Sequence, residues 1–117
     1  MNPRFDNQET NPLTETTFFL LLSLTSGPRH GYAILKDVQE LSFGRVVLST
    51  GTLYGAIKRL VEMGWIEPVD NLQAEVSGRP RKEYRLTSLG RRLYDAEFAR
   101  LKGLVTAAQL RMSGNQA

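Results

Sequence analysis

Three observations predict a mainly α-helical fold with a small β-hairpin. The chain has 117 residues, 41% of them hydrophobic and 23% charged, which matches the size and balance of one compact domain. Helical patterns fill the first half of the chain and return in residues 88–112. Between them lie two short segments rich in strand-forming residues, 65–69 and 82–87. We therefore expect three short helices, a hairpin and one long final helix.

The first helix is expected to follow a flexible polar arm, residues 1–12. Thr14 is its expected N-cap, Leu13 can pack on Phe18 as a hydrophobic staple, and Gly27 ends the helix. Apolar side chains cover more than one stripe of this helix, so their burial needs packing partners on two sides. These side chains are Phe18, Phe19, Leu20, Leu21, Leu22 and Leu24.

Two amphipathic helices follow. The second spans residues 30–41, with Tyr32 expected in the core. The third begins at Ser49 or Thr50, either of which can cap a helix, and Gly64 ends it. Its core-facing residues are expected to be Leu53, Ile57, Leu60 and Val61.

The last helix carries two apolar faces. Thr87 is its expected N-cap, and it runs to about Met112 before a flexible tail, residues 113–117. Leu89 and Leu93 are expected to anchor it on its own domain. Other apolar residues repeat with the 3.5-residue period of a packed helix seam, which predicts an interface with another helix. This seam comprises Tyr94, Phe98, Leu101, Val105, Ala108 and Met112.

Positive charge is concentrated in one part of the chain. The net charge is only +3, but residues 77–92 contain six lysines and arginines against one glutamate, a net +5 that leaves −2 for the rest. Arg79, Arg81 and Lys82 lie in or beside the hairpin loop, around a proline that restricts the backbone. This pattern predicts a basic patch suited to the phosphates or the minor groove of DNA.

Catalysis and metal binding lack the residues that they require. The chain has no cysteine, and its one histidine, His30, has no partner at metal-ligand spacing, so a role at a helix start is favoured for it. We find no phosphate-binding glycine loop and no recognisable frame of paired carboxylates. We expect no enzyme activity, no cofactor and no metal. The polar N-terminus and the short longest apolar run, residues 18–22, predict a cytoplasmic protein that does not contact membranes.

The order of the elements is that of a winged helix-turn-helix followed by a long C-terminal dimerisation helix. In this arrangement the third helix can enter the major groove while the hairpin lies on the adjacent backbone. Residues 13–87 would form the DNA-binding domain and residues 88–112 the dimerisation helix. Hydroxyls and free N–H groups at the start of the third helix favour phosphate. The predicted DNA-binding residues are Ser49, Thr50, Gly51, Thr52, Tyr54, Lys58, Arg79, Arg81 and Lys82.

Five spaced blocks add a family resemblance. They read His30-Gly31-Tyr32, Leu48-Ser49-Thr50-Gly51-Thr52-Leu53-Tyr54, Lys58-Arg59-Leu60, Gly64, and Gly78-Arg79-Pro80-Arg81-Lys82-Glu83-Tyr84-Arg85-Leu86-Thr87. In this order they resemble the PadR family of transcriptional regulators, over about residues 13–92. Thr50 and Gly55 depart from the family's frequent prolines, and Trp65 replaces a more usual aliphatic residue. The length resembles the branch with a single C-terminal helix.

The resemblance implies a dimeric repressor of transcription, often one that releases DNA on binding a small aromatic or cationic effector. Two dimer-related third helices would read a palindromic operator on double-stranded DNA. We expect a homodimer formed through the first and last helices, by Phe18, Phe19, Leu22, Tyr94, Phe98, Leu101, Val105, Ala108 and Met112.

An aromatic cluster between the subunits is the candidate effector pocket. Its lining would be Phe18, Tyr94, Phe98 and Leu101. Plain dimer packing is the favoured interpretation of these residues, because nothing polar in the sequence identifies a ligand. The alternative function for the whole chain is a winged helix that binds another protein through the seam of its last helix, without sequence-specific DNA binding. The basic hairpin favours the DNA-binding interpretation.

Overall fold

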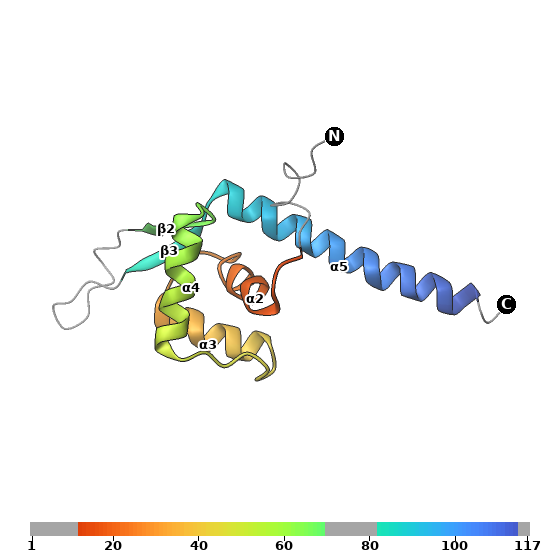
Figure 1. Ribbon diagram of the computed structural model, residues 1–117, viewed down its shortest axis with the longest axis horizontal. Helices are drawn as coiled ribbons and strands as arrows, with labels where there is room; N and C mark the ends of the chain where they lie inside the picture. Colours follow the sequence, from red (N-terminus) through yellow and green to blue (C-terminus); the bar gives the residue numbers. More distant parts are fainter. Residues whose placement is uncertain (1–11, 70–81, 115–117) are drawn as a thin grey trace.

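The computed structural model describes residues 12–69 and 82–114, so residues 1–11 of the expected arm, the loop with Arg79 and Arg81 and residues 115–117 of the expected tail lie outside these ranges. Among the described residues, the first three helices are α2 (Glu15–Ser23), α3 (Gly31–Leu41) and α4 (Thr50–Glu62) (Figure 1). The strands are β1 (Arg29–His30), β2 (Ile66–Val69) and β3 (Glu83–Leu86), and the last helix is α5 (Ser88–Gly114). The mainly α-helical architecture is therefore confirmed. Within the described residues, no helix is both long enough and apolar enough to cross a membrane.

Side-chain caps begin the helices where the sequence predicts. The Thr14 hydroxyl accepts a hydrogen bond from the Thr17 backbone N–H at 3.0 Å, which confirms the N-cap of α2. His30 caps α3, because its Nδ1 accepts from the Ala33 backbone N–H at 3.3 Å. The sole histidine thus has the expected role at a helix start.

The first helix ends earlier than its glycine. The last residue of α2 is Ser23, and the chain turns at Leu24 before it reaches Gly27, whose φ is +139°. Leu20 and Leu21 are buried, and α2 packs against both α3 and α5. The expectation of packing partners on two sides is confirmed.

The hairpin belongs to a three-stranded antiparallel sheet with the order β1-β3-β2. The sequence predicts β2 and β3 but not β1, because two residues are too few to show an alternating pattern. Tyr84 of β3 is opposite Arg29 on one side and Pro68 on the other. The position of Pro68 on an edge strand is compatible with its missing N–H group.

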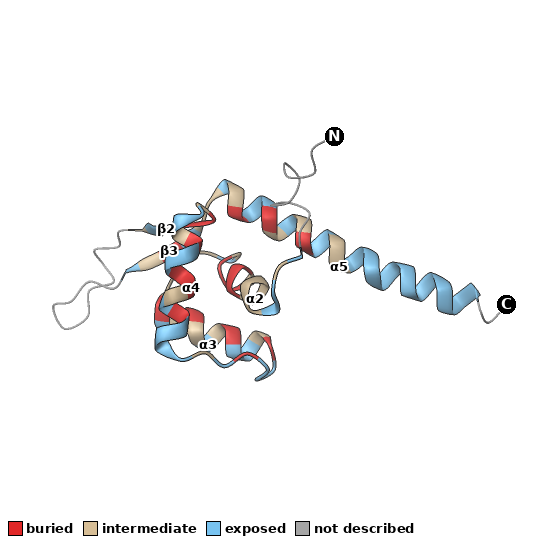
Figure 2. Cartoon of the chain, in the orientation of Figure 1, coloured by how far each residue is buried: buried red, intermediate tan, exposed pale blue. Residues whose placement is uncertain are grey.

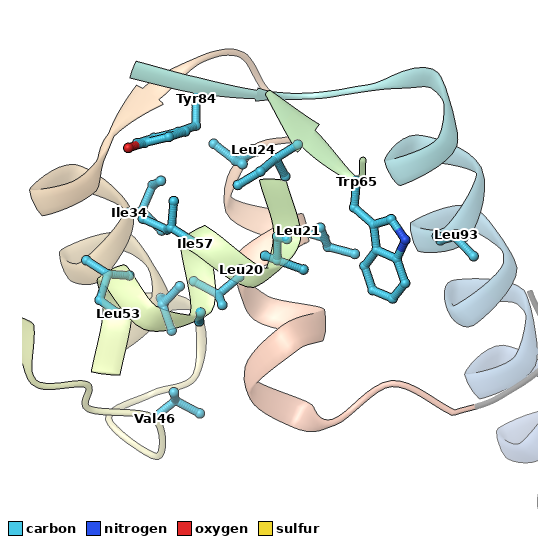
Figure 3. Close-up of a cluster of buried hydrophobic side chains, with 14 residues drawn as sticks. Leu20, Leu21, Leu24, Ile34, Val46, Leu53, Ile57, Trp65, Tyr84 and Leu93 are labelled. Carbon is cyan, nitrogen blue, oxygen red and sulfur yellow. The ribbon is translucent and has the colours of Figure 1, made fainter. Parts of the chain in front are cut away.

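The core lies between α2, α3, α4 and the sheet (Figure 3). Leu53, Ile57 and Leu60 are buried as expected, while Val61 is half-buried. The expectation for Tyr32 is wrong, because 63% of this residue is exposed. The buried face of α3 consists of Gly31, Ile34 and Val38, and Tyr32 lies about 200° around the helix from Ile34.

The start of α5 is held tightly against the start of β2, an arrangement that we call the Trp65 junction. The Thr87 backbone N–H donates to the Trp65 carbonyl at 3.1 Å, and the Thr87 hydroxyl donates to the Gly64 carbonyl at 2.5 Å. The same hydroxyl accepts from the Gly90 N–H at 3.0 Å, which confirms Thr87 as the N-cap. A Cβ at position 90 would collide with the Trp65 carbonyl oxygen, so only glycine fits there.

A buried carboxylate also ties α5 to the first helix. Glu97 is 5% exposed and makes two hydrogen bonds with Arg100, at 2.9 and 2.7 Å. It also accepts from the Leu13 backbone N–H, next to the cap of α2. The hydrogen bonds from Arg100 are the largest influence on the pKa of Glu97, which lies below its usual value despite burial.

Replacing Glu97 by Gln should destabilise the fold in a pH-dependent manner. The charge-assisted bonds are worth about 1.5 to 3 kcal/mol, so urea unfolding at pH 7 should show a lower free energy of unfolding for Glu97→Gln. Because the pKa of Glu97 is lower in the folded chain, ionised Glu97 stabilises the fold above about pH 4.3, the pKa of an unperturbed glutamate. This stabilisation is lost as the pH falls through the pKa of Glu97 in the folded chain. The gap between the two proteins should therefore shrink below about pH 4.3. A gap that stays constant down to pH 3 would contradict this role.

Candidate nucleic-acid interface

The two faces of α4 separate anchoring residues from residues available to a partner. Leu53, Ala56, Ile57 and Leu60 are buried against the core. The opposite face is exposed in Figure 2, and it carries five of the residues predicted to bind DNA. They are Thr50, Gly51, Thr52, Tyr54 and Lys58. The spacing of three and four residues therefore predicted the orientation of this helix correctly.

The start of α4 offers hydrogen-bond donors to an anion. The Ser49 hydroxyl caps the helix by accepting from the Thr52 backbone N–H at 3.1 Å, and it also donates to the Thr52 hydroxyl at 3.0 Å. Ser49 thus has a structural role beside the predicted one. The cap leaves the N–H groups of Thr50 and Gly51 without an acceptor inside the helix. Such a helix end, with exposed hydroxyls beside it, attracts phosphate.

Tyr54 is half-exposed and lies across the start of α3. Its relative exposure is 45%, and its hydroxyl and ring are close to the Cα of Gly31. The buried Tyr84 of β3 lines the same groove as Tyr54. Burial raises the pKa of Tyr84, and the neighbouring Tyr54 raises it further. Three elements therefore meet around one exposed tyrosine.

A groove of about 340 Å³ separates α4 from the hairpin. Lys58 of α4 and Lys82, the residue before β3, lie on its rim with Tyr54 and Glu62. Both lysines are exposed. The groove joins the predicted recognition helix to the base of the basic hairpin, as a path for a sugar-phosphate backbone requires.

The described basic residues of the hairpin differ in their availability. Arg85 forms an ion pair with Glu67 across the two strands, at 2.7 Å. Lys82 points to the groove instead, while Arg79 and Arg81 lie outside the described residues. Among the described hairpin residues, Lys82 is therefore more available to a partner than Arg85, whose charge is paired with Glu67.

The exposed Tyr32 is a further candidate residue for this interface, although the sequence predicted it in the core. It follows Gly31 directly, so it lies at the end of α3 on which Tyr54 rests. The Lys36 ammonium is 5.8 Å from the centre of its ring. The only signal in the sequence was the apolar register of α3, which places Tyr32 off the core face.

The residues predicted for the dimer interface divide into two groups. Phe18 of α2 stacks on Tyr94 of α5 with 5.3 Å between ring centres, and Tyr94 stacks on Phe98 at 6.3 Å. These contacts within one chain bring together three of the four residues of the candidate effector pocket. Leu101 follows on α5 and is half-buried, as are Phe19 and Leu22 on α2.

The second half of α5 extends beyond the rest of the domain and is exposed along its length (Figures 1 and 2). The seam residues Val105, Ala108 and Met112 are all exposed there. Leu104 and Leu110 are also exposed, although neither belongs to the predicted seam. By contrast, Gly90, Leu93 and Glu97 in the first half of α5 are buried against the domain.

The described residues contain no group of three histidine, aspartate or glutamate side chains placed to hold a metal ion. The arrangement around α4 instead offers hydroxyls, backbone N–H groups, an aromatic ring and ammonium groups on one surface. In protein–DNA complexes, groups of these kinds contact phosphates and base edges.

Comparison with solved structures identifies the fold. A PadR family transcription regulator from Clostridium difficile superposes with a TM-score of 0.67 at 23% identity, over 83% of this chain and 97% of that chain. Bacillus subtilis PadR, in a crystal structure with operator DNA, gives 0.61 at 23% identity, over 73% and 46%. A PadR family regulator from Eggerthella lenta gives 0.61 at 25% identity, over 82% and 80%. These likenesses confirm the winged helix-turn-helix with a long C-terminal helix.

Comparison of sequences identifies the family. Over 94 residues the chain is 37% identical to an uncharacterised 37.1 kDa protein in transposon TN4556 of Streptomyces fradiae. The aligned region covers 78% of this chain but 25% of that protein. The chain thus spans a quarter of the length of this curated relative. Residues 20–96 match the profile of the transcriptional regulator PadR-like family. The chain therefore belongs to the PadR-like family of transcriptional regulators.

Proposed function

We propose that this regulator is a cytoplasmic repressor that binds a palindromic operator in double-stranded DNA as a homodimer. The observation that carries the proposal is the exposed face of α4, where Thr50, Thr52, Tyr54 and Lys58 surround a helix start while the buried face fixes the helix on the core. The similar Bacillus subtilis protein was crystallised with operator DNA, which supports DNA binding by this chain. Repression itself is inferred from the family resemblance.

The contacts with DNA would divide by type. The start of α4 and Tyr54 would lie in the major groove, where base edges can be read. Lys58, Lys82 and the hairpin residues Arg79 and Arg81 would contact phosphates or the minor groove. Two such units in a symmetric dimer would read half-sites about 10 base pairs apart, centre to centre.

The exposed second half of α5 supports the homodimer. An apolar stripe of this length in contact with water is unfavourable for a monomer, and a second copy of the same helix would cover it symmetrically. The aromatic stack of Phe18, Tyr94 and Phe98 leads into this stripe. We further propose that a small aromatic or cationic effector enters beside this stack and releases DNA by altering the angle between the two subunits.

The alternative function, a winged helix that binds another protein, uses the same stripe for a different helix. Sedimentation of the purified chain separates these two interpretations, because a homodimer forms without any other protein. Selection of duplexes from a random pool then tests for DNA recognition. Enrichment of one palindromic motif supports the repressor, and no enrichment contradicts it.

Opposite outcomes are expected for two neighbouring residues of α4. Tyr54→Ala should lower operator affinity by about 10- to 100-fold and change the free energy of unfolding by less than about 1 kcal/mol, because Tyr54 is half-exposed. Leu53→Ala should cost about 2 to 5 kcal/mol of stability, because it leaves a cavity in the core. Duplex titration and urea unfolding measure the two effects. If the two variants exchange these phenotypes, the assigned faces are reversed.

Removal of a hairpin cation should act on all DNA sequences alike. Lys82→Ala should weaken binding to operator and unrelated duplexes by similar factors, and it should reduce the slope of log affinity against log salt by about one unit. Lys102→Ala, which removes an exposed charge from α5, is the matched control and should leave the slope unchanged. An unchanged slope for Lys82→Ala would show that Lys82 does not contact phosphate.

The assembly is tested by charge within the stripe of α5. Replacing Leu101 and Val105 together by Asp should give monomers in sedimentation at micromolar concentration, because a dimer would bury four carboxylates. Leu110→Asp is the control, since Leu110 is exposed and apolar but lies off the seam. A double variant that remains dimeric, or an unmodified chain that is monomeric, would refute the interface.

A further inference from the structure

We propose that Gly31 is a positioning residue for DNA recognition: its missing side chain creates the space that holds Tyr54 in its reading pose. This inference rests on the proposed DNA-binding function and assigns a specificity-determining role to a residue that does not itself contact DNA. It also explains why a glycine stands at the first position of α3.

The geometry around Gly31 carries the inference. A Cβ built on this glycine would lie 2.6 Å from Cζ and 2.9 Å from Cε1 of Tyr54, and closer still to its hydroxyl. All three positions are nearer than real Cβ contacts allow. The end of the Tyr54 side chain therefore rests directly on the backbone of α3, and any other residue at position 31 would displace it.

Backbone conformation does not explain this glycine. The described glycines with positive φ are Gly27, Gly44 and Gly64, so Gly31 has a conformation that alanine adopts freely. Glycine is also a poorer helix former than alanine. The backbone therefore does not require glycine at position 31, and the three atoms nearest to a Cβ built there all belong to Tyr54.

Fixing Tyr54 in this way benefits DNA binding. A half-exposed tyrosine on a helix has several rotamers, and binding DNA with a free side chain would cost the entropy of selecting one. Contact with Gly31 holds the ring before DNA arrives, and Tyr84 lines the same groove as Tyr54. The position of the Tyr54 hydroxyl relative to α4 is then the same in each encounter, as discrimination between base pairs requires.

A double-mutant cycle tests this contact in the whole chain. Gly31→Ala alone should displace Tyr54 and lower affinity for the duplex selected by the unmodified protein by at least about 10-fold. Its melting temperature should not rise. In the Tyr54→Ala background the same change should raise the melting temperature by about 2 to 6 °C, because only the gain in helix propensity remains, and it should cause no further loss of affinity.

Three further variants separate positioning from general effects of a glycine substitution. Gly103→Ala lies in open space on α5 and should raise the melting temperature in either background without changing DNA affinity. Gly90→Ala meets the Trp65 backbone instead, so it should destabilise the fold, and Tyr54→Ala should not rescue it. In the Tyr54→Phe background, Gly31→Ala should not raise the melting temperature as it does in the Tyr54→Ala background, because the ring carbons also meet the new methyl group.

Each outcome decides the inference. Additive losses of affinity, or a Gly31→Ala variant that binds its selected duplex normally, would overturn it. If Gly31→Ala alone unfolds the chain, recovery of the fold in the double variant supports the contact, and no recovery overturns it. Failure of the unmodified protein to select any duplex would instead contradict the proposed function, and the melting temperatures would still show whether Gly31 holds Tyr54.

Discussion

The Trp65 junction sets the direction of the long helix relative to the surface proposed to face DNA. Thr87 binds the backbone of residues 64 and 65 through both its N–H and its hydroxyl, and Gly90 allows α5 to lie directly on the Trp65 carbonyl. β2 continues from this junction, and α4 ends just before it. A change in the packing at this point would rotate α5 relative to α4. In the proposed dimer, the separation of the two recognition helices therefore depends on this backbone contact.

A second connection joins α5 to the other end of the domain. Glu97 binds Arg100 on its own helix and the Leu13 backbone at the start of α2. Together with the stack of Phe18 on Tyr94, it holds α2 along the first half of α5. α2 also packs against α3, on which Tyr54 rests. A continuous series of contacts thus connects the proposed dimer helix with the residues proposed to read DNA, so an effector bound near the stack would be physically connected to both.

Sequence patterns predicted most of the helices and the orientation of α4. Residues spaced by three and four along α4 share one face, so Leu53, Ile57 and Leu60 are buried together, and this spacing depends only on helix geometry. Side-chain caps at Thr14, His30 and Thr87 are local interactions over a few residues, which explains their prediction from the sequence. The short β1 was missed because its pairing with β3 joins residues more than 50 positions apart in the chain.

The sequence by itself determined the fold class, the family and the exposed face of α4, because each depends on local periodicity or on motifs in order. Only the tertiary structure decided which exposed residues share a surface. It brought Gly31, Tyr54 and Tyr84 together from three elements, paired Arg85 with Glu67 and buried Glu97. These contacts depend on how the helices cross and on how the sheet pairs. No pattern within one element contains that information, because packing depends on the shapes of both surfaces.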